Sequence, residues 1–327
     1  MNKINYLYTF FALVANTAAV PALAQGAANY PAKAVRFIAP FPPGGSTDLL
    51  ARLVAQKLTE TWGQQVLVEN RGGAAGTIGV EIAARAAPDG YTLVMGHVGT
   101  FGVNPTLYPK LPYDAVRDFA PITVLATVTN GMAVHPSLPV KTARDFITLA
   151  KARPGELLYA SGGSGSASHL AGEYFKLLTR INMVHVPYKG TAPAITSMIS
   201  GETTMTITGL VALMPHLKSQ RLKLLGVASM KRLAILPEAP TLHESGAPGY
   251  DANQWYGVLT QAAVPRDIVG KLHTDMVRVL ARPDVRERLA ADGAEAVANT
   301  PEQFAAHIKA EIARWAPVVR ASGAKPD

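Results

Sequence analysis

Three stretches of this chain each join an apolar run, a glycine-rich turn and a helix-forming segment. They span residues 35–58, 66–83 and 157–175, and their turns read PFPPGGST, NRGGAAGT and SGGSGSAS. Turns of this kind leave backbone N–H groups unpaired at the start of a helix, where the helix dipole is positive. Because both features favour negative charge, the sequence predicts turns that hold an anion. The Gly-Lys-Ser/Thr motif of a nucleotide-binding P-loop is missing from all three.

Short runs rich in Val, Ile and Leu alternate with amphipathic helical segments along the chain. The alternation predicts an α/β fold with mostly parallel strands. In the first helix, the leucines at 49, 50, 53 and 58 recur with Val54 at helical spacing, so this stripe is expected to be buried. The expected strands are 35–39, 66–68, 93–95, 122–126, 132–135, 157–160, 183–186, 205–208, 224–228 and 256–260.

Two breaks divide this succession of strands and helices. One falls at residues 129–131, and the other is a loop at 237–251 that is rich in Pro, Gly and polar residues. The simplest interpretation is a discontinuous first lobe, residues 25–128 with 254–327, and an inserted second lobe, residues 129–253. Two crossings between the lobes would then form a hinge.

The N-terminus has the pattern of a secretory signal peptide. Lys3 precedes an apolar run that ends at Pro21 and the small-residue sequence Ala22-Leu23-Ala24. A membrane anchor is the alternative, but the run is shorter than the ~20 residues that span a bilayer. We therefore expect residues 1–24 to be removed between Ala24 and Gln25, and the mature protein to work in the periplasm.

Composition excludes several classes of function. The chain has no cysteine, so disulfides and thiolate chemistry are excluded. Its formal charge is +8, but the basic residues are scattered along the sequence, so no nucleic-acid partner is expected. The eight histidines are too widely spaced for a local metal motif. We expect neither a metal nor a cofactor.

The first two turns offer backbone amides and hydroxyls to a ligand. In the first, Gly44 and Gly45 permit close backbone approach, and either Ser46 or Thr47 is a candidate helix cap. Asp48 fits two interpretations equally well, a helix cap or a group that orders the turn around a ligand. In the second, the predicted contacts are the amides of Ala75 and Gly76 and the side chain of Thr77. Arg71 is assigned a structural role.

The third turn, Ser161 to His169, contains four serines. A secreted hydrolase using Ser164 or Ser166 with His169 is one hypothesis, yet the sequence lacks the last glycine of the G-x-S-x-G nucleophile elbow and a placed acid. Serine hydroxyls that donate to an anion remain the preferred interpretation. His169 is expected to orient the turn.

With these turns located, the mature chain resembles the Bug family of extracytoplasmic solute receptors, the periplasmic binding component associated with tripartite tricarboxylate transporters. The segments that carry the resemblance are 40–48, 69–76, 88–93, 103–105, 111–121, 186–190 and 304–325. It implies a two-lobed fold like that of type II periplasmic binding proteins. It also implies that the lobes close on a small carboxylate and deliver it to integral membrane transporter subunits, without catalysis. A ligand-dependent signalling receptor is the alternative, and we expect a monomer.

The resemblance also implies which residues meet the ligand. The matching positions in the first lobe are the turn from Phe41 to Asp48 and residues 75–77, completed by the loop from His97 to Phe101 with Thr100. In the second lobe they are Ser161, Ser164, Ser166 and Tyr188. Family members commonly carry an aspartate-containing run where this chain has threonines at 203, 204, 206 and 208. A wall that includes Thr208 repels a second negative group less, which favours a di-acid or an aromatic acid over an amino acid.

Overall fold

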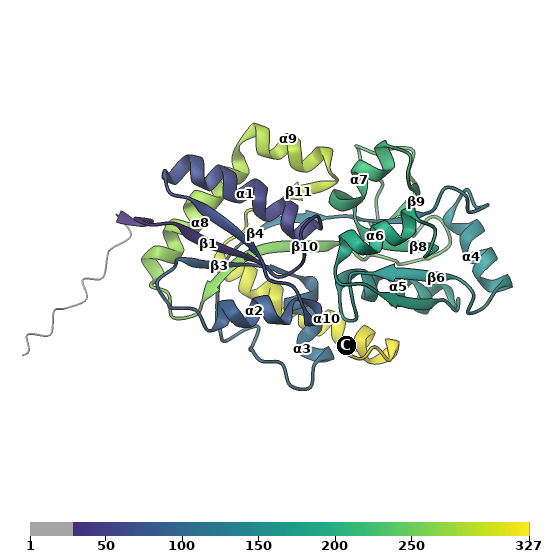
Figure 1. The fold of residues 1–327 in the computed structure, drawn as a ribbon, viewed down its shortest axis with the longest axis horizontal. Coiled ribbons are helices and arrows are strands. Elements are labelled where there is room, and N and C mark those ends of the chain that lie inside the picture. The colour runs from purple at the N-terminus through teal and green to yellow at the C-terminus, as the bar shows by residue number, and fades with distance from the viewer. Residues whose placement is uncertain (1–28, 327) are drawn as a thin grey trace, which may run out of the picture.

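The computed structural model describes residues 29–326, and these form two α/β lobes side by side (Figure 1). The large lobe has a six-stranded sheet in the order β11-β4-β10-β3-β1-β2, and the small lobe a five-stranded sheet in the order β7-β6-β8-β5-β9. The predicted signal peptide, residues 1–24, lies outside the described residues. Within residues 29–326, every helix is too short or too polar to cross a membrane.

Ten strands lie where the sequence predicted them, within a few residues at each end. The large sheet contains β1 (Val35–Ala39), β2 (Val66–Asn70), β3 (Thr92–His97), β4 (Phe119–Val128), β10 (Gln254–Gln261) and β11 (Ala294–Ala296). The small sheet contains β5 (Asn130–Val134), β6 (Leu158–Ser161), β7 (Val184–Pro187), β8 (Met205–Gly209) and β9 (Lys223–Val227). The three-residue strand β11 was not predicted.

Helices cover both sheets. Those of the large lobe are α1 (Ser46–Trp62), α2 (Thr77–Ala84), α3 (Asn104–Leu107), α8 (Arg266–Ala281), α9 (Pro283–Ala291) and α10 (Pro301–Ser322), with the short turns η2 (Ala74–Gly76) and η3 (Val98–Val103). Those of the small lobe are α4 (Ala143–Ala152), α5 (Ala167–Thr179), α6 (Thr191–Ile199) and α7 (Leu210–Lys218). The C-terminal helix α10 packs on the large lobe and also contacts α5 of the small lobe (Figure 1).

Both sheets are mixed rather than purely parallel, although most strands in each sheet run in one direction. Strand β1 runs parallel to β2 and β3, and β6 parallel to β7 and β8. In contrast, β10 is antiparallel to β3 and β4, and β5 is antiparallel to β8 and β9. The reason lies in the crossings: β5 and β10 carry the chain from one lobe into the other, so each enters its sheet from the edge where the neighbouring strands end.

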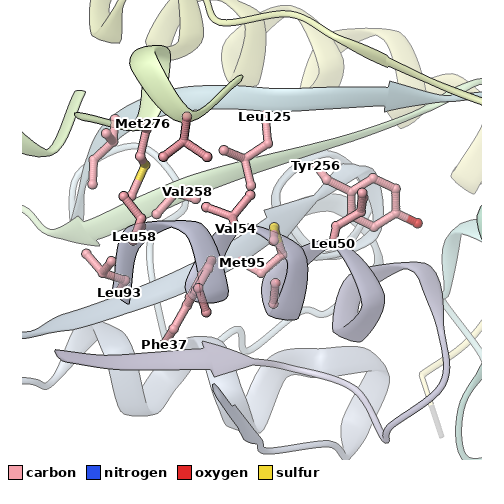
Figure 2. Packing of buried hydrophobic residues seen from close by; sticks show 14 of the residues in the cluster. Phe37, Leu50, Val54, Leu58, Leu93, Met95, Leu125, Tyr256, Val258 and Met276 are labelled. Atoms are coloured by element: carbon pink, nitrogen blue, oxygen red, sulfur yellow. The ribbon is translucent and has the colours of Figure 1, made fainter. Parts of the chain in front are cut away.

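The core of the large lobe shows why the first helix forms where it does. Leu50, Val54 and Leu58 recur every four residues and are almost fully buried against the sheet (Figure 2). Gly63 ends the helix in a left-handed conformation with φ of 66°. Leu49, expected in the buried stripe, is instead 37% exposed, because the buried face is centred one position further round the helix.

Candidate ligand-binding site

The strand directions place several helix N-termini in the space between the lobes. The carboxyl ends of β1, β6, β7 and β8 meet at the edges where the lobes face each other, and α1, α5, α6 and α7 begin directly after them. Ligands of open α/β sheets bind outside the carboxyl ends of strands for this reason. A helix N-terminus carries N–H groups without partners inside the helix and the positive end of a dipole.

A small cavity, here called the inner cavity, lies at this meeting point. Its volume of about 20 Å³ is room for one water-sized group. Its wall comes from both lobes and consists of Phe41, Gly45, Ser46, Thr47, His97, Gly162, Ser166, Ala167, Ser168, Thr191, Thr208, Gln254 and Tyr256. The residues of this wall carry hydroxyls, amides and one imidazole, but no acid or cationic lysine or arginine.

Two helices present uncapped N-termini to the inner cavity. The N-cap residues of α1 and α6 are Gly45 and Gly190, and neither helix has a side-chain cap. Elsewhere, Thr142 closes a capping box on α4 and Thr300 does so on α10, whereas α8 and α9 also begin without a side-chain cap. The first N–H groups of α1 and α6 are therefore available to a negatively charged group.

Asp48 orders the first turn from behind. Its carboxylate accepts hydrogen bonds from the Gly44 amide at 3.0 Å, from Arg52 Nε at 2.9 Å and from Asn70 Nδ2 at 2.9 Å. Burial works to raise the pKa of Asp48, but these hydrogen bonds and the Arg52 charge outweigh it and hold the pKa below its usual value. Asp48 does not line the inner cavity; it holds the Gly44 amide of the turn, and α1 has no side-chain cap at its N-cap residue.

His97 is a neutral donor at the floor of the inner cavity. The Gly99 amide donates to His97 Nδ1 at 2.7 Å, which leaves the proton of the neutral ring on Nε2. Full burial lowers the pKa of His97 to about 3. The ring packs between Phe41 and Tyr256, with centroid distances of 4.8 and 5.8 Å.

Tyr256 lies beside His97 and is hydrogen-bonded to Gln254, at the start of the strand that returns from the small lobe. Its hydroxyl points away from the packed core side chains and donates to Gln254 Oε1 at 2.5 Å (Figure 2). Burial raises the pKa of Tyr256 well above its ordinary value, and the nearby Ser46 hydroxyl offsets a smaller part. Tyr256 therefore stays protonated at physiological pH.

The serine turn is held by two stacked histidines. Ser161 Oγ contacts His185 Nε2 at 2.6 Å, and the ring of His185 stacks on that of His169 with centroids 3.9 Å apart. His169 Nδ1 accepts from the Gly165 amide at 3.0 Å, and Ser166 Oγ caps α5 by accepting from the His169 amide. His169 thus orients the turn as expected, through its backbone and ring.

A larger space, here called the outer cavity, opens beside the inner one. It measures about 590 Å³ and shares Phe41 and Gly162 with the inner cavity. Its wall also draws on both lobes and consists of Phe41, Pro42, Pro43, Asn70, Gly72, Gly73, Ala74, Ala75, Gly76, Gly162, Gly163, Tyr188, Lys189 and Gly190.

Eight of the predicted site residues line one of the two cavities: Phe41, Gly45, Ser46, Ser166 and Thr208 in the inner one, and Phe41, Ala75, Gly76 and Tyr188 in the outer one. Seven line neither: Gly44, Asp48, Thr77, Thr100, Ser161, Ser164 and His169. Most of these seven hold the turns from inside. Thr77 Oγ1 donates to Ala74 O, and Thr100 closes a capping box with His97.

Sequence reasoning missed three residues of the inner wall that come from outside the glycine-rich turns, and Lys189 and Gly190 of the outer wall. Thr191 begins α6, while Gln254 and Tyr256 lie on β10. Tyr256 was placed on a strand, but a tyrosine in an apolar strand looks like any core residue. Only the pairing of β10 with β3 and β4 brings it to the cavity floor.

The contacts of Ser164 and Ser166 do not support the hydrolase hypothesis. Ser166 Oγ meets the His169 amide and Ser168 Oγ rather than an imidazole nitrogen. Ser161 does contact a histidine, but its side chain is fully buried and lines neither cavity. Within residues 29–326, no group of three or more His, Cys, Asp or Glu side chains is placed to hold a metal ion.

Comparison with known proteins identifies the family. A model described as "Tripartite tricarboxylate transporter family receptor" matches residues 50–324. Protein BugT of Bordetella pertussis is 37% identical over 298 residues, which cover 91% of this chain and 91% of BugT.

Two solved structures match along nearly their whole length. An R. palustris protein solved with adipate is 37% identical, with a TM-score of 0.89, and the match covers 91% of this chain and 100% of that one. MatC from Rhodopseudomonas palustris, solved with bound malate, is 33% identical, with a TM-score of 0.85, and the match covers 89% and 100%. The expected two-lobed α/β class and the resemblance to the Bug proteins are confirmed. The chain belongs to the tripartite tricarboxylate transporter receptor family of periplasmic solute-binding proteins.

Proposed function

We propose that this chain captures a small carboxylate between its lobes in the periplasm and presents it to integral membrane transporter subunits. The observation that carries the proposal is the inner cavity, where two uncapped helix N-termini and several neutral donors converge from both lobes. A ligand that contacts both lobes favours the state in which they are closed. Similar proteins solved with adipate and with malate support the choice of ligand.

The proposal extends to the ligand contacts and the organisation of the chain. Ser46, Ser166 and Thr208 donate to the carboxylate, and the amides at the start of α1 and α6 complete its surroundings. The lobes divide at residues 128/129 and 253/254, and the mature chain begins at Gln25 and acts as a monomer. We propose binding without catalysis, which the membership of this chain in a family of periplasmic solute-binding proteins supports.

A thermal-shift screen of dicarboxylates against their diamides tests this function. A ligand at 100 times its dissociation constant adds about 2.7 kcal/mol to the free energy of unfolding. We expect carboxylates such as adipate and malate to raise the melting temperature, and the uncharged diamides to leave it unchanged. Equal shifts from acid and amide, or a shift only from sugars or cations, would show that the site does not select a negative charge.

Ser46→Ala links the screen to the inner cavity. Removing a donor to a charged group costs about 1.5–3 kcal/mol, so affinity for the best carboxylate falls at least about tenfold. Calorimetric titration measures this loss. The matched control is Ser137→Ala, a serine that lines neither cavity, which leaves the affinity unchanged.

A further inference from the structure

The outer cavity has the size of a ligand-binding site, whereas the inner cavity does not. At about 590 Å³ the outer cavity lies within the usual range of about 300–1,000 Å³ for small-molecule sites. The inner cavity, at about 20 Å³, holds little more than one oxygen of a carboxylate. Because the two cavities share Phe41 and Gly162 in their walls, we expect most of a ligand whose head is in the inner cavity to lie in the outer one.

The outer wall is apolar where it meets the inner cavity. Phe41, Pro42 and Pro43 come from the turn after β1, and Tyr188 faces them from the small lobe. Asn70 contributes a polar side chain, but its groups are already used: Nδ2 donates to Phe41 O and Asp48 Oδ1, and Oδ1 accepts from Arg52. An apolar ligand body therefore gains contacts here without displacing a hydrogen bond.

The charges of the wall discriminate between ligands. Among the described residues that line the two cavities, the side chains include no aspartate or glutamate, and the one lysine is Lys189 of the outer cavity. An ammonium group placed in either cavity would lose water without gaining an anionic partner, which is costly. A second carboxylate would instead have Lys189, an exposed residue of the outer wall, as its one cationic partner.

We infer that this receptor selects elongated carboxylates with an alkyl or aryl body and no ammonium group, and that Lys189 admits a second carboxylate at the far end. The inference rests on the proposed carboxylate-binding function and adds the class of ligand. It assigns Tyr188 to the apolar body and Lys189 to the far charge.

A matched series of straight-chain acids tests the inference by calorimetric titration. Butyrate and hexanoate differ by two methylene groups, and each buried methylene strengthens binding about fourfold. We expect hexanoate to bind about 15-fold more tightly than butyrate. Adipate binds at least as tightly as hexanoate, whereas 2-aminohexanoate and 6-aminohexanoate bind at least about tenfold more weakly.

Two variants assign these effects to their residues. Lys189→Gln weakens adipate about threefold or more and leaves hexanoate unchanged, while Lys151→Gln, an exposed lysine of α4 that lines neither cavity, changes neither ligand. Tyr188→Ala weakens hexanoate more than butyrate, and Tyr188→Phe, which keeps the ring, preserves their ratio.

The outcomes separate this inference from the function on which it rests. Equal affinities for butyrate and hexanoate, or an aminohexanoate that binds as tightly as hexanoate, would overturn the inference and leave a carboxylate receptor in place. A carboxylate response confined to short or amino-bearing acids would do the same. Silence from every carboxylate, in this series and in the wider screen, would overturn the proposed function itself.

Discussion

His97 makes the stability of the protein depend on pH. Its pKa is about 3 in the folded state and about 6.5 unfolded, so between these values the unfolded chain binds more protons at this site. Stability from this group is complete above about pH 6.5 and is lost as pH falls toward 3, by up to about 1.4 kcal/mol per pH unit. We predict a shallower loss in His97→Gln, measured by urea unfolding from pH 7 to pH 4.

A second buried histidine, His169, is present in both proteins and serves as the internal control for this prediction. Burial lowers the pKa of His169 to about 4, so its contribution has the same sign and persists in the His97→Gln variant. The difference between wild type and variant therefore reports His97 alone. Parallel pH profiles for the two proteins would show that the His97 ring titrates in the folded state as it does in the unfolded one.

For single residues, the sequence was a better guide to the turns that lie at the cavities than to the side chains that line them. Ser46 and Ser166 follow strands and precede helices, so local pattern was enough to place them. Thr100 and Ser161 also carry hydroxyls and also lie close to the end of a strand. Their hydroxyls, however, make hydrogen bonds with the backbone instead of lining a cavity. The direction of each hydroxyl depends on contacts with distant segments, such as the contact of Ser161 with His185. The local sequence therefore does not predict it.

The two crossing strands are tied to each other by a buried hydrogen bond. Gln254, at the start of β10, donates through Nε2 to Asn130 Oδ1 at the start of β5, with 2.5 Å between the atoms. Asn130 Nδ2 in turn donates to Ala252 O at 2.6 Å. Both side chains are almost fully buried, so this pair fixes the spacing of the two segments on which the lobes would turn.

Breaking this pair is predicted to destabilise the fold. Gln254→Leu leaves Asn130 Oδ1 and the Tyr256 hydroxyl without their partner, so the free energy of unfolding falls by about 1–3 kcal/mol in urea titrations. The same substitution at the exposed Gln65 should change it by less than about 0.5 kcal/mol. Combining Gln254→Leu with Asn130→Ala should give a coupling energy above about 0.5 kcal/mol, and strictly additive effects would contradict the tie.

The positions of the strands could be predicted where each strand is a continuous apolar run. The directions of the strands within the sheets could not be predicted in this way. Ten apolar runs became strands, but β11 has three residues, Ala294–Ala296, with no long apolar run to reveal it. The antiparallel directions of β5 and β10 follow from the crossings between lobes, which no single run encodes. An inserted lobe with two crossings already required the returning strand to enter from the opposite edge, and applying that rule would have predicted these two antiparallel strands.

In the whole molecule, the two lobes approach each other closely at the inner cavity. A Cβ built on Gly45 of the large lobe lies 3.4 Å from Thr191 Cβ of the small lobe, and one built on Gly209 lies 2.7 Å from Ser46 Oγ. The space left between the lobes at this point is that of about one water, so a ligand reaches it only when the lobes separate. We predict from this close approach that the arrangement is the closed state.

A pair of engineered cysteines tests the closed state directly, because the natural chain has none. The Cβ separation at positions 45 and 191 is close to the 3.5–4.5 Å typical of a disulfide, and Gly45 has an ordinary φ of −87°. We predict that Gly45→Cys with Thr191→Cys forms a disulfide under mild oxidation, measured as loss of free thiols and a gel shift removed by reductant. Gly45→Cys with Gly270→Cys, whose partner position has no neighbour within 4 Å, should keep both thiols. If both pairs stay reduced, the lobes do not meet in solution at this seam.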